Sequence, residues 1–393
     1  MKILIISPAD LPIPATKGGA IETLVTYVLN ENEEKNKLDI DVITPYQDGL
    51  ESEVKKYKNC KFIIFNSNRK TMKLLDIMRK VVYKVSRGMI PYFDELTCFA
   101  KKYVRQNSSR YQAVIFEGNS MQALAMKNKD SKNILHIHTD VFNLEFRYAH
   151  KVNRYVDEYW GVSKYIEQQI RKVVGEEKKI RTLMNCADLS SFDKSRYENT
   201  QALRESFDLK KDDFVVIFAG RLDPQKGVKE LVQAILNLNK SDIKLVVVGG
   251  NNYSDNTQSW YIKELNEMIR EHQDLFRFTG YMEHEKMPMM YAMADVAVVP
   301  SKCNEAAGLS LIEAKTMGCP VIATNRGGIP EYIGQGGILI DPKKNLVEKL
   351  QRAIEYLYLN ELVREQLSYA NMQERGKFSS QRYYDDFVEL LNE

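Results

Sequence analysis

Short apolar runs alternate with longer stretches of mixed polarity along the first half of the chain. Six of these runs have the length and composition of buried strands: residues 2–7, 41–44, 61–65, 113–117, 134–138 and 158–162. Longer helical stretches, such as residues 22–30, separate them. This alternation predicts a parallel sheet that carries helices on both faces.

The second half of the chain repeats the alternation after a polar stretch at residues 190–213, which we interpret as a linker with a short helix. The runs predicted as strands are residues 214–219, 244–248, 276–279, 296–299, 321–324 and 337–340, and helical stretches follow at 346–358, 360–376 and 380–392. The pattern therefore predicts an α/β protein with two doubly wound domains, at residues 1–190 and 191–378. A last helix at 379–393 would follow, and the strand ends of the two domains would face a common cleft.

Length and composition agree with this organisation. A chain of 393 residues is too long for one hydrophobic core, and 44% hydrophobic with 28% charged residues is ordinary for a globular protein. The five cysteines are odd in number, scattered and without a Cys-x-x-Cys pair, which argues against a disulfide framework and a structural zinc site. The first apolar run is too short for a signal peptide, and no run approaches the roughly 20 residues of a membrane span. We predict a cytoplasmic protein, and attachment to the inner face of the membrane stays open.

The net charge of +3 conceals a basic region. Residues 55–105 contain fourteen Lys or Arg and three acidic residues, and apolar residues recur at helical spacing within residues 69–87. One interpretation is a helix that packs its apolar face on the first domain and exposes its basic face. The other is that the packed helix also attracts an anionic membrane surface. Nucleic acid is disfavoured because no basic-aromatic module accompanies the charge.

Two carboxylates lie around a predicted helix start. Seven residues separate Glu305 from Glu313, Gly308 lies between them, and the helical composition ends at Gly318. A helix start reached through a glycine loop favours phosphate because its N–H groups are free. Carboxylates would repel phosphate but suit hydroxyl groups on either side of it, so the segment indicates a nucleotide-sugar. Ala307, Gly308 and Leu309 would line this site.

Two cations follow the predicted strand at residues 214–219. Arg221 and Lys226, flanked by Gly220 and Gly227, would stabilise the charge that develops on a leaving diphosphate, although ordinary surface charge is the alternative. The dinucleotide fingerprint and the Walker loop are both absent from the sequence. NAD binding and P-loop phosphoryl transfer therefore lose their main support.

Further candidates lie near other strand ends. Gly18 and Gly19 would let the backbone approach a sugar or phosphate, unless they only form a turn. Gly249 and Glu283 are weaker candidates for the nucleotide pocket. Asp39 and Asp41 have the spacing of a manganese motif but precede a strand, so we assign them no metal role.

Two histidines share a predicted strand. His136 and His138 would point to one side of the strand, because Ile137 lies between them. For His136 we favour a core position. His138, at the strand end, is the candidate for the site.

Several of these segments together resemble one family. They are Lys17-Gly18-Gly19, His138-Thr139, the stretch from Gly220-Arg221 to Lys226-Gly227, Ala294-Asp295-Val296 with Pro300-Ser301, and the Glu305-x7-Glu313 signature. In order over residues 1–335, they resemble retaining glycosyltransferases of the GT-B fold, in the family four that contains bacterial polysaccharide transferases.

The resemblance implies roles for these residues. Glu305 would contact hydroxyls of the donor sugar, Glu313 the ribose hydroxyls, and His138 the donor sugar and the acceptor side. Main-chain groups near Glu283 would hold the base. The family usually has a bulky aromatic before the glycine where this chain has Ala307, so donor preference does not carry over.

The resemblance also implies a reaction. A hexose would move with retention, without metal or cofactor, from a nucleotide-sugar to a glycan or lipid-linked oligosaccharide in the synthesis of a cell-surface polysaccharide. UDP is expected from family frequency alone, and the last helix would cross back onto the first domain. Two alternatives stay open: a sugar-nucleotide epimerase of the same fold, and a non-catalytic partner subunit of another transferase.

Overall fold

The computed structural model divides the chain into two compact units, Met1–Met184 with Tyr383–Glu393, and Asn185–Arg382. It describes residues 1–393 except 10, 17, 67–69, 198 and 251–259, and leaves the side chains of residues 70–74 undescribed. Lys17 and Arg69, which belong to segments singled out in the sequence, lie outside the described residues.

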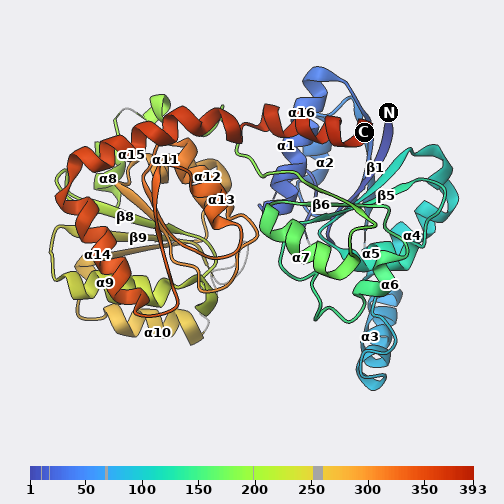
Figure 1. Ribbon diagram of the computed structural model, residues 1–393, viewed down its shortest axis with the longest axis horizontal. Helices are drawn as coiled ribbons and strands as arrows, with labels where there is room; N and C mark the ends of the chain where they lie inside the picture. Colours follow the sequence, from blue (N-terminus) through green and yellow to red (C-terminus); the bar gives the residue numbers. More distant parts are fainter. Residues whose placement is uncertain (10, 17, 67–69, 198, 251–259) are drawn as a thin grey trace. The chain divides into compact units, whose positions relative to one another are not determined.

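The first unit contains a seven-stranded sheet in the order β3-β2-β1-β4-β5-β6-β7, with every pair parallel (Figure 1). Its strands are β1 (Lys2–Ile6), β2 (Asp39–Pro45), β3 (Cys60–Phe65), β4 (Ala113–Glu117), β5 (Lys132–Ile137), β6 (Glu158–Gly161) and β7 (Lys179–Thr182). The order reverses between β1 and β4, as in doubly wound folds, where ligands bind outside the carboxyl ends of the strands. The sheet core is apolar: Ile3 to Ile6 and Val114 to Phe116 are fully buried.

Helices surround this sheet. They are α1 (Ala20–Lys35), α2 (Leu50–Val54), α3 (Lys70–Val85), α4 (Glu95–Asn107), α5 (Ser120–Met126), α6 (Ala149–Asn153) and α7 (Lys164–Val174), with the short η1 (Ser108–Arg110). Side-chain caps start α4, α5 and α7: Asp94 accepts from the amide of Thr97, Asn119 from that of Met121, and Ser163 from that of Ile166. Such caps satisfy amides that the helix leaves free.

The second unit contains a six-stranded parallel sheet in the order β10-β9-β8-β11-β12-β13. The strands are β8 (Phe214–Ala219), β9 (Ile243–Val248), β10 (Phe276–Gly280), β11 (Val296–Val299), β12 (Val321–Thr324) and β13 (Gly337–Ile340). The helices are α8 (Gln201–Ser206), α9 (Val228–Leu238), α10 (Trp260–Ile269), α11 (Met287–Ala292), α12 (Leu309–Thr316), α13 (Ile329–Ile333), α14 (Leu346–Leu359) and α15 (Glu361–Glu374), with η2 (Lys194–Tyr197), η3 (Pro224–Lys226), η4 (Gln273–Leu275), η5 (His284–Lys286) and η6 (Arg375–Phe378). A continuous apolar core joins β8, β9, α9, α10 and α14.

The last helix, α16 (Ser380–Asn392), belongs to the second unit at its start and to the first unit from Tyr383 onward. There Tyr384 donates to Oδ1 of Asn32 at 2.6 Å, and the ring of Phe387 lies edge-on to Trp160 with centroids 5.3 Å apart. The sequence put the division of the chain after residues 190 and 378, whereas the structure divides it after Met184 and Arg382.

The strands agree closely with the sequence pattern, and the predicted doubly wound α/β fold of each half is confirmed. One strand was missed. Strand β7 reads Lys-Ile-Arg-Thr, lies at the sheet edge and is nowhere fully buried, so it lacks the apolar run that marks the others.

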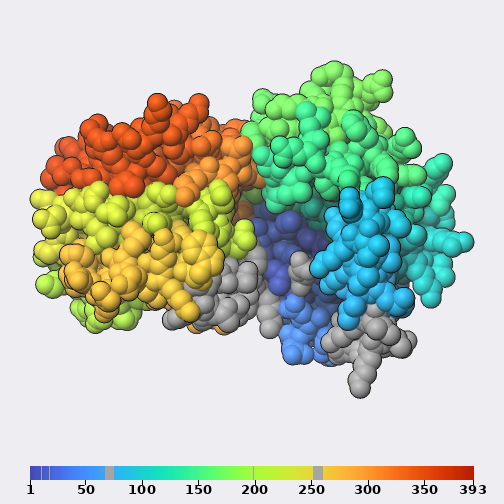
Figure 2. Space-filling model, turned by 90° about the horizontal axis from the view of Figure 1, so that it is seen from below, coloured from blue at the N-terminus to red at the C-terminus, as the bar shows by residue number. Residues whose placement is uncertain are grey.

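Helix α3 contradicts the sequence interpretation of its apolar face. The side chains of Leu75, Ile77, Met78, Val81, Val82 and Val85 are 44% to 78% exposed. The polar side faces the unit instead: Asp76 accepts from the hydroxyl of Tyr92 at 2.7 Å, and Nη1 of Arg79 lies 3.2 Å from Sγ of Cys98. Figure 2 shows this segment in bright blue at the surface. No helix in the described part of the chain is both long and apolar enough to cross a bilayer.

Candidate functional site

In the second unit, the predicted residues gather at the carboxyl ends of β8, β9 and β11. Gly249, after β9, packs so closely on Gly220, after β8, that a Cβ on Gly249 would lie 1.9 Å from the Gly220 carbonyl oxygen. Gly227 has a φ of 74°, and a Cβ there would lie 2.0 Å from the carbonyl oxygen of Pro300. The glycines that flank the cations therefore allow three strand ends to meet.

Lys226 and Glu305 form an ion pair at this edge. Nζ of Lys226 lies 2.6 Å from Oε1 of Glu305, and the hydroxyl of Ser301 donates to the same oxygen at 2.6 Å. A backbone hydrogen bond holds the loop of Glu305, since the carbonyl oxygen of Glu305 accepts from the amide of Gly328 at 2.7 Å. The structure thus joins two predicted residues that are far apart in the sequence.

Arg221 is less constrained. Its side chain is 51% exposed, and Nη2 lies 3.8 Å from Oδ2 of Asp223, too far for a hydrogen bond. The guanidinium can therefore turn toward an anion at little cost in lost contacts.

Helix α12 starts beside Glu305, as predicted. Gly308 precedes it with a φ of 85°, and a Cβ on Gly308 would meet no atom closer than 3.9 Å. Ala307 is buried and Leu309, the first helical residue, is half-buried. The helix start therefore combines free amides with a position that is open around Gly308.

Glu313, on the buried side of α12, has two partners that the sequence did not reveal. Nε2 of His284 lies 2.7 Å from Oε1, and the hydroxyl of Tyr291 donates to Oε2 at 3.0 Å. Lys315, a nearby lysine of the same helix, does not pair with Glu313 and instead contacts Glu374 at 2.9 Å. Glu313 is therefore part of a hydrogen-bonded group within the unit and not an ordinary surface ion pair.

The surroundings of His284 and Tyr291 shift the pKa values of both side chains. Burial would lower the pKa of His284, but the charge and hydrogen bond of Glu313 outweigh it and raise the pKa. Burial raises the pKa of Tyr291 well above its ordinary value, and Glu313 adds to this effect. Tyr291 is thus a hydrogen-bond donor at neutral pH.

The Glu283 side chain does not join this group. It is 67% exposed and lies 3.0 Å from Nζ of Lys286. The next residue, His284, reaches Glu313 instead. The sequence offered one signal for this contact: His284 directly follows Glu283, which was predicted to lie near the nucleotide pocket.

In the first unit, Gly18 and Gly19 precede α1, with φ values of 75° and 101°. A Cβ on Gly19 would lie 2.2 Å from Oε2 of Glu22. These glycines are therefore required by the backbone, which leaves their predicted part in ligand binding open.

His138 lies one residue beyond β5 and contacts a residue that the sequence analysis did not single out. Oε2 of Glu117, the last residue of β4, lies 2.8 Å from Nε2 of His138 and 3.0 Å from Nδ1 of His136. All three side chains are buried. Burial would raise the pKa of Glu117, but the imidazoles lower it to about 2, whereas burial and His136 lower the pKa of His138 to about 4.

These three side chains are of types that bind metals, with one potential ligand atom each inside a 4.8 Å group. A metal ion that bound Nε2 of His138 would replace its present hydrogen bond to Glu117. Asp39 and Asp41 have structural partners, as their position before a strand suggested. Lys2 contacts Asp39 at 2.9 Å, and Tyr111 donates to the buried Asp41 at 2.6 Å.

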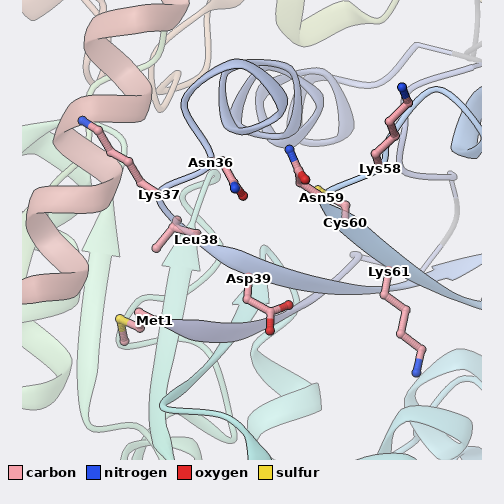
Figure 3. A pocket seen from close by; sticks show the side chains of 9 residues that line it. All are labelled: Met1, Asn36, Lys37, Leu38, Asp39, Lys58, Asn59, Cys60 and Lys61. Atoms are coloured by element: carbon pink, nitrogen blue, oxygen red, sulfur yellow. The ribbon is translucent and has the colours of Figure 1, made fainter.

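Two surface hollows lie at opposite edges of the first sheet. The larger, about 470 Å³, is lined by residues at the strand starts, among them Met1, Asp39 and Cys60 (Figure 3). The other, about 320 Å³, is lined by Pro45 and Phe65 at strand ends and by Asp94. Ligands of doubly wound sheets bind at the strand ends, so the smaller hollow is the better candidate.

The chain is similar to known proteins over most of its length. Residues 199–374 match the family model described as glycosyl transferases group 1. Spore coat protein SA of Bacillus subtilis is 25% identical over 404 aligned residues, which cover 99% of both chains. YtcC of the same organism, named as a glycosyltransferase, is 26% identical over 87% of this chain and 79% of its own.

A solved structure has the same fold. The Anabaena protein HepE, determined in complex with UDP and glucose, superimposes with a TM-score of 0.75 at 18% identity, over 100% of this chain and 99% of its own. Together with the two parallel sheets and the matched second unit, this fold leads to one conclusion. The chain is a glycosyltransferase of the GT-B fold, and its residues 199–374 match the group 1 glycosyl transferases.

Proposed function

We propose that the protein transfers a hexose from a UDP-sugar, with retention at the anomeric carbon and without a metal ion. The acceptor would be a glycan or lipid-linked oligosaccharide in the synthesis of a cell-surface polysaccharide. The observation that carries the proposal is the group at the strand ends of the second unit, where the Lys226–Glu305 pair adjoins the start of α12. The UDP and glucose bound to HepE favour uridine and a hexose.

The cations would take the leaving diphosphate. The ammonium of Lys226 has three N–H donors, so it can keep Glu305 and still donate to a phosphate oxygen. Arg221, half-exposed and weakly held, would close on the same charge. These positive charges would supply the stabilisation that a metal would otherwise supply as the anomeric C–O bond breaks.

The carboxylates would bind hydroxyl groups. Glu305 would accept from the transferred sugar, and Glu313 from the ribose, with His284 and Tyr291 fixing its orientation. Main-chain amides at Gly308 and Leu309 would contact phosphate. Gly249 and the main chain near Glu283 would line the base and ribose.

For the retaining step we propose front-side attack. The acceptor hydroxyl oxygen bonds to the anomeric carbon on the face that the diphosphate leaves, and its proton passes to a leaving phosphate oxygen. In the first unit, His138, Gly18 and Gly19 would contact the sugars, and the hollow beside Pro45 and Phe65 would hold part of the acceptor.

A thermal-shift panel with UDP-, GDP-, ADP- and TDP-sugars in EDTA tests the donor site. A ligand present at about 100-fold over its Kd adds about 2.7 kcal/mol to the free energy of unfolding. We expect this gain with UDP-sugars, its loss in Glu313→Gln, and its retention in the control Glu264→Gln, whose carboxylate pairs with Lys229 on the surface. Stabilisation by another base alone would overturn the choice of UDP.

Product stereochemistry tests the reaction. Proton NMR of the first-formed product should show the anomeric configuration of the donor, and EDTA should leave the rate unchanged. An inverted product would overturn retention, and a rate abolished by EDTA and restored by Mn²⁺ would overturn the metal-independent step.

We further propose that α3 attaches the protein to an anionic membrane surface. Its exposed apolar residues lie next to Lys80, Lys84 and Arg87, which are exposed as well. A second copy of the same surface would bring like charges together, whereas anionic lipid headgroups complement them. Each cation near such a surface contributes about 1 kcal/mol.

Co-sedimentation with vesicles tests the attachment. Binding is expected with phosphatidylglycerol in phosphatidylcholine and not with phosphatidylcholine alone. The pair Val81→Ser and Val85→Ser should abolish it, while Leu359→Ser with Leu362→Ser, equally exposed residues of the second unit, should not. Equal binding by both pairs, or a concentration-dependent dimer that α3 variants dissociate, would overturn it.

A further inference from the structure

The Glu117–His138 contact has features that a simple core packing does not require. The Glu117 side chain is directly opposite His136 in the register of β4 and β5, so both project from one face of the sheet near its carboxyl edge. His138 follows at that edge and shares the same carboxylate oxygen. The two imidazole centroids are 3.9 Å apart. One carboxylate oxygen thus contacts two neighbouring rings, whose planes are tilted by 50°, and one of these rings is a candidate for the site.

The charges fix where the His138 proton lies. An ionised carboxylate only accepts hydrogen bonds, and Glu117 stays ionised beside the two imidazoles. A neutral imidazole has one N–H, and burial keeps His138 neutral. The 2.8 Å contact between Nε2 and Oε2 therefore requires the proton on Nε2, which leaves a lone pair on Nδ1.

Nδ1 of His138 is not used within the described part of the chain. This buried atom has no hydrogen-bond partner there. A buried acceptor without a partner is costly, and such groups in native proteins call for an explanation.

We propose that Glu117 is a positioning residue for His138: it holds the imidazole in the tautomer protonated on Nε2 and so reserves Nδ1 to accept a hydrogen bond from a sugar hydroxyl. The inference deepens the proposed function and rests on it for the sugar. A hydroxyl that reaches Nδ1 must displace whatever covers that atom in the free protein. Glu117 itself contacts no substrate.

Nitrogen-15 NMR of the histidine side chains tests the tautomer without any need for activity. In the wild type we expect one pyrrole-type shift at Nε2 and one pyridine-type shift at Nδ1 of His138, assigned with His138→Gln. Addition of the stabilising UDP-sugar should move the Nδ1 shift upfield, as an accepted hydrogen bond does. A proton on Nδ1, or an Nδ1 signal that saturating donor leaves unchanged, would overturn the proposal.

Variants test the positioning role. Glu117→Ala should lower kcat by about tenfold or more and mix the two tautomers, and Glu117→Gln, whose carbonyl can still accept from Nε2, should restore most of both. The matched control is Glu158→Gln, another buried carboxylate of the first unit, which contacts Lys132 and Trp160. It should alter stability and leave the His138 tautomer unchanged. If the Glu117 variants lost only stability, as the control does, the role would be structural.

Two further outcomes separate the competing explanations. If Zn²⁺ bound stoichiometrically and abolished the Nε2–H signal, a metal site would replace the positioning role, because the metal would use the same atoms. If no UDP-sugar stabilised the protein while the Nε2–H tautomer persisted and required Glu117, the proposed function would fail and the tautomer assignment would stand.

Discussion

Each unit has acid–base contacts near the carboxyl ends of its own strands, but the environments of these contacts differ. In the second unit, Lys226 with Glu305 and His284 with Glu313 join a positively charged or readily protonated group to a carboxylate in partly exposed positions. In the first unit, one oxygen of Glu117 contacts two buried imidazoles, and burial lowers the pKa of His138. One edge is therefore suited to charged phosphates and the other to neutral hydroxyls.

The difference follows from where the partners come from. Lys226 lies in a loop after β8, so it remains near solvent. Glu117 and His136 are opposite each other on central strands, where neighbouring side chains exclude water. A carboxylate and its basic partner therefore differ in exposure to water, and so in electrostatics, when they lie on a loop and when they lie on central strands.

Removal of the lysine charge should have the largest effect. Lys226→Ala is expected to lower kcat by about 100-fold to 1,000-fold, because charge grows on the leaving phosphates in the transition state. The control is Lys229→Ala, which removes a surface lysine paired with Glu264 in the same unit and should leave kcat within about twofold. Equal losses in both variants would mean that Lys226 acts through stability and not through the leaving group.

The next largest effect is expected where Gly227 lets two strand ends of the second unit approach closely. Gly227→Ala is expected to lower the free energy of unfolding by about 3 kcal/mol, from left-handed strain and from the clash with the Pro300 carbonyl. Gly49 precedes α2 with a φ of 88° and has open space around it, so Gly49→Ala should cost only the strain, about 1 kcal/mol. Urea unfolding followed by circular dichroism measures both, and equal costs would contradict the packing argument.

The smallest effect concerns pH. Because the folded-state pKa of His284 is raised, its pair with Glu313 stabilises the fold most below the unfolded pKa of about 6.5 and loses this contribution as pH rises through the folded value. His284→Asn should therefore lose about 1 kcal/mol or less near pH 6, and progressively less at higher pH. Urea unfolding of both proteins across this range checks the sign; a loss that grows with pH would reverse it.

Much of this molecule was readable from short apolar runs. The strands β4, β8, β11 and β12 begin and end where the sequence predicted, because parallel strands that are buried on both faces read as uninterrupted apolar segments. The edge strand β13 was predicted as well, because Gly-Ile-Leu-Ile is still an apolar run although only Ile340 in it is buried. The glycines around Lys226 and Glu305 indicated the candidate site of the second unit, because tight turns and close backbone approaches accept few residues other than glycine.

The partners of the site residues were less accessible to sequence reasoning. His284 and Tyr291 meet Glu313 from η5 and α11, and Glu117 meets His138 across two strands. Such contacts depend on register and on which helix covers which face, and no local pattern records either. For α3, the prediction of a buried apolar face was wrong. Periodicity showed that its apolar residues share one face, but only packing decides whether that face points inward.

The sequence by itself determined the α/β class, the strand order along the chain, the cations and carboxylates of the second unit and the family resemblance, because each depends on local periodicity or short motifs. Only the tertiary structure decided that Lys226 contacts Glu305, that α3 exposes its apolar side, and that His138 shares Glu117 with His136. Charge state and tautomer depend on burial and on neighbours distant in sequence, and those exist only after the chain has folded.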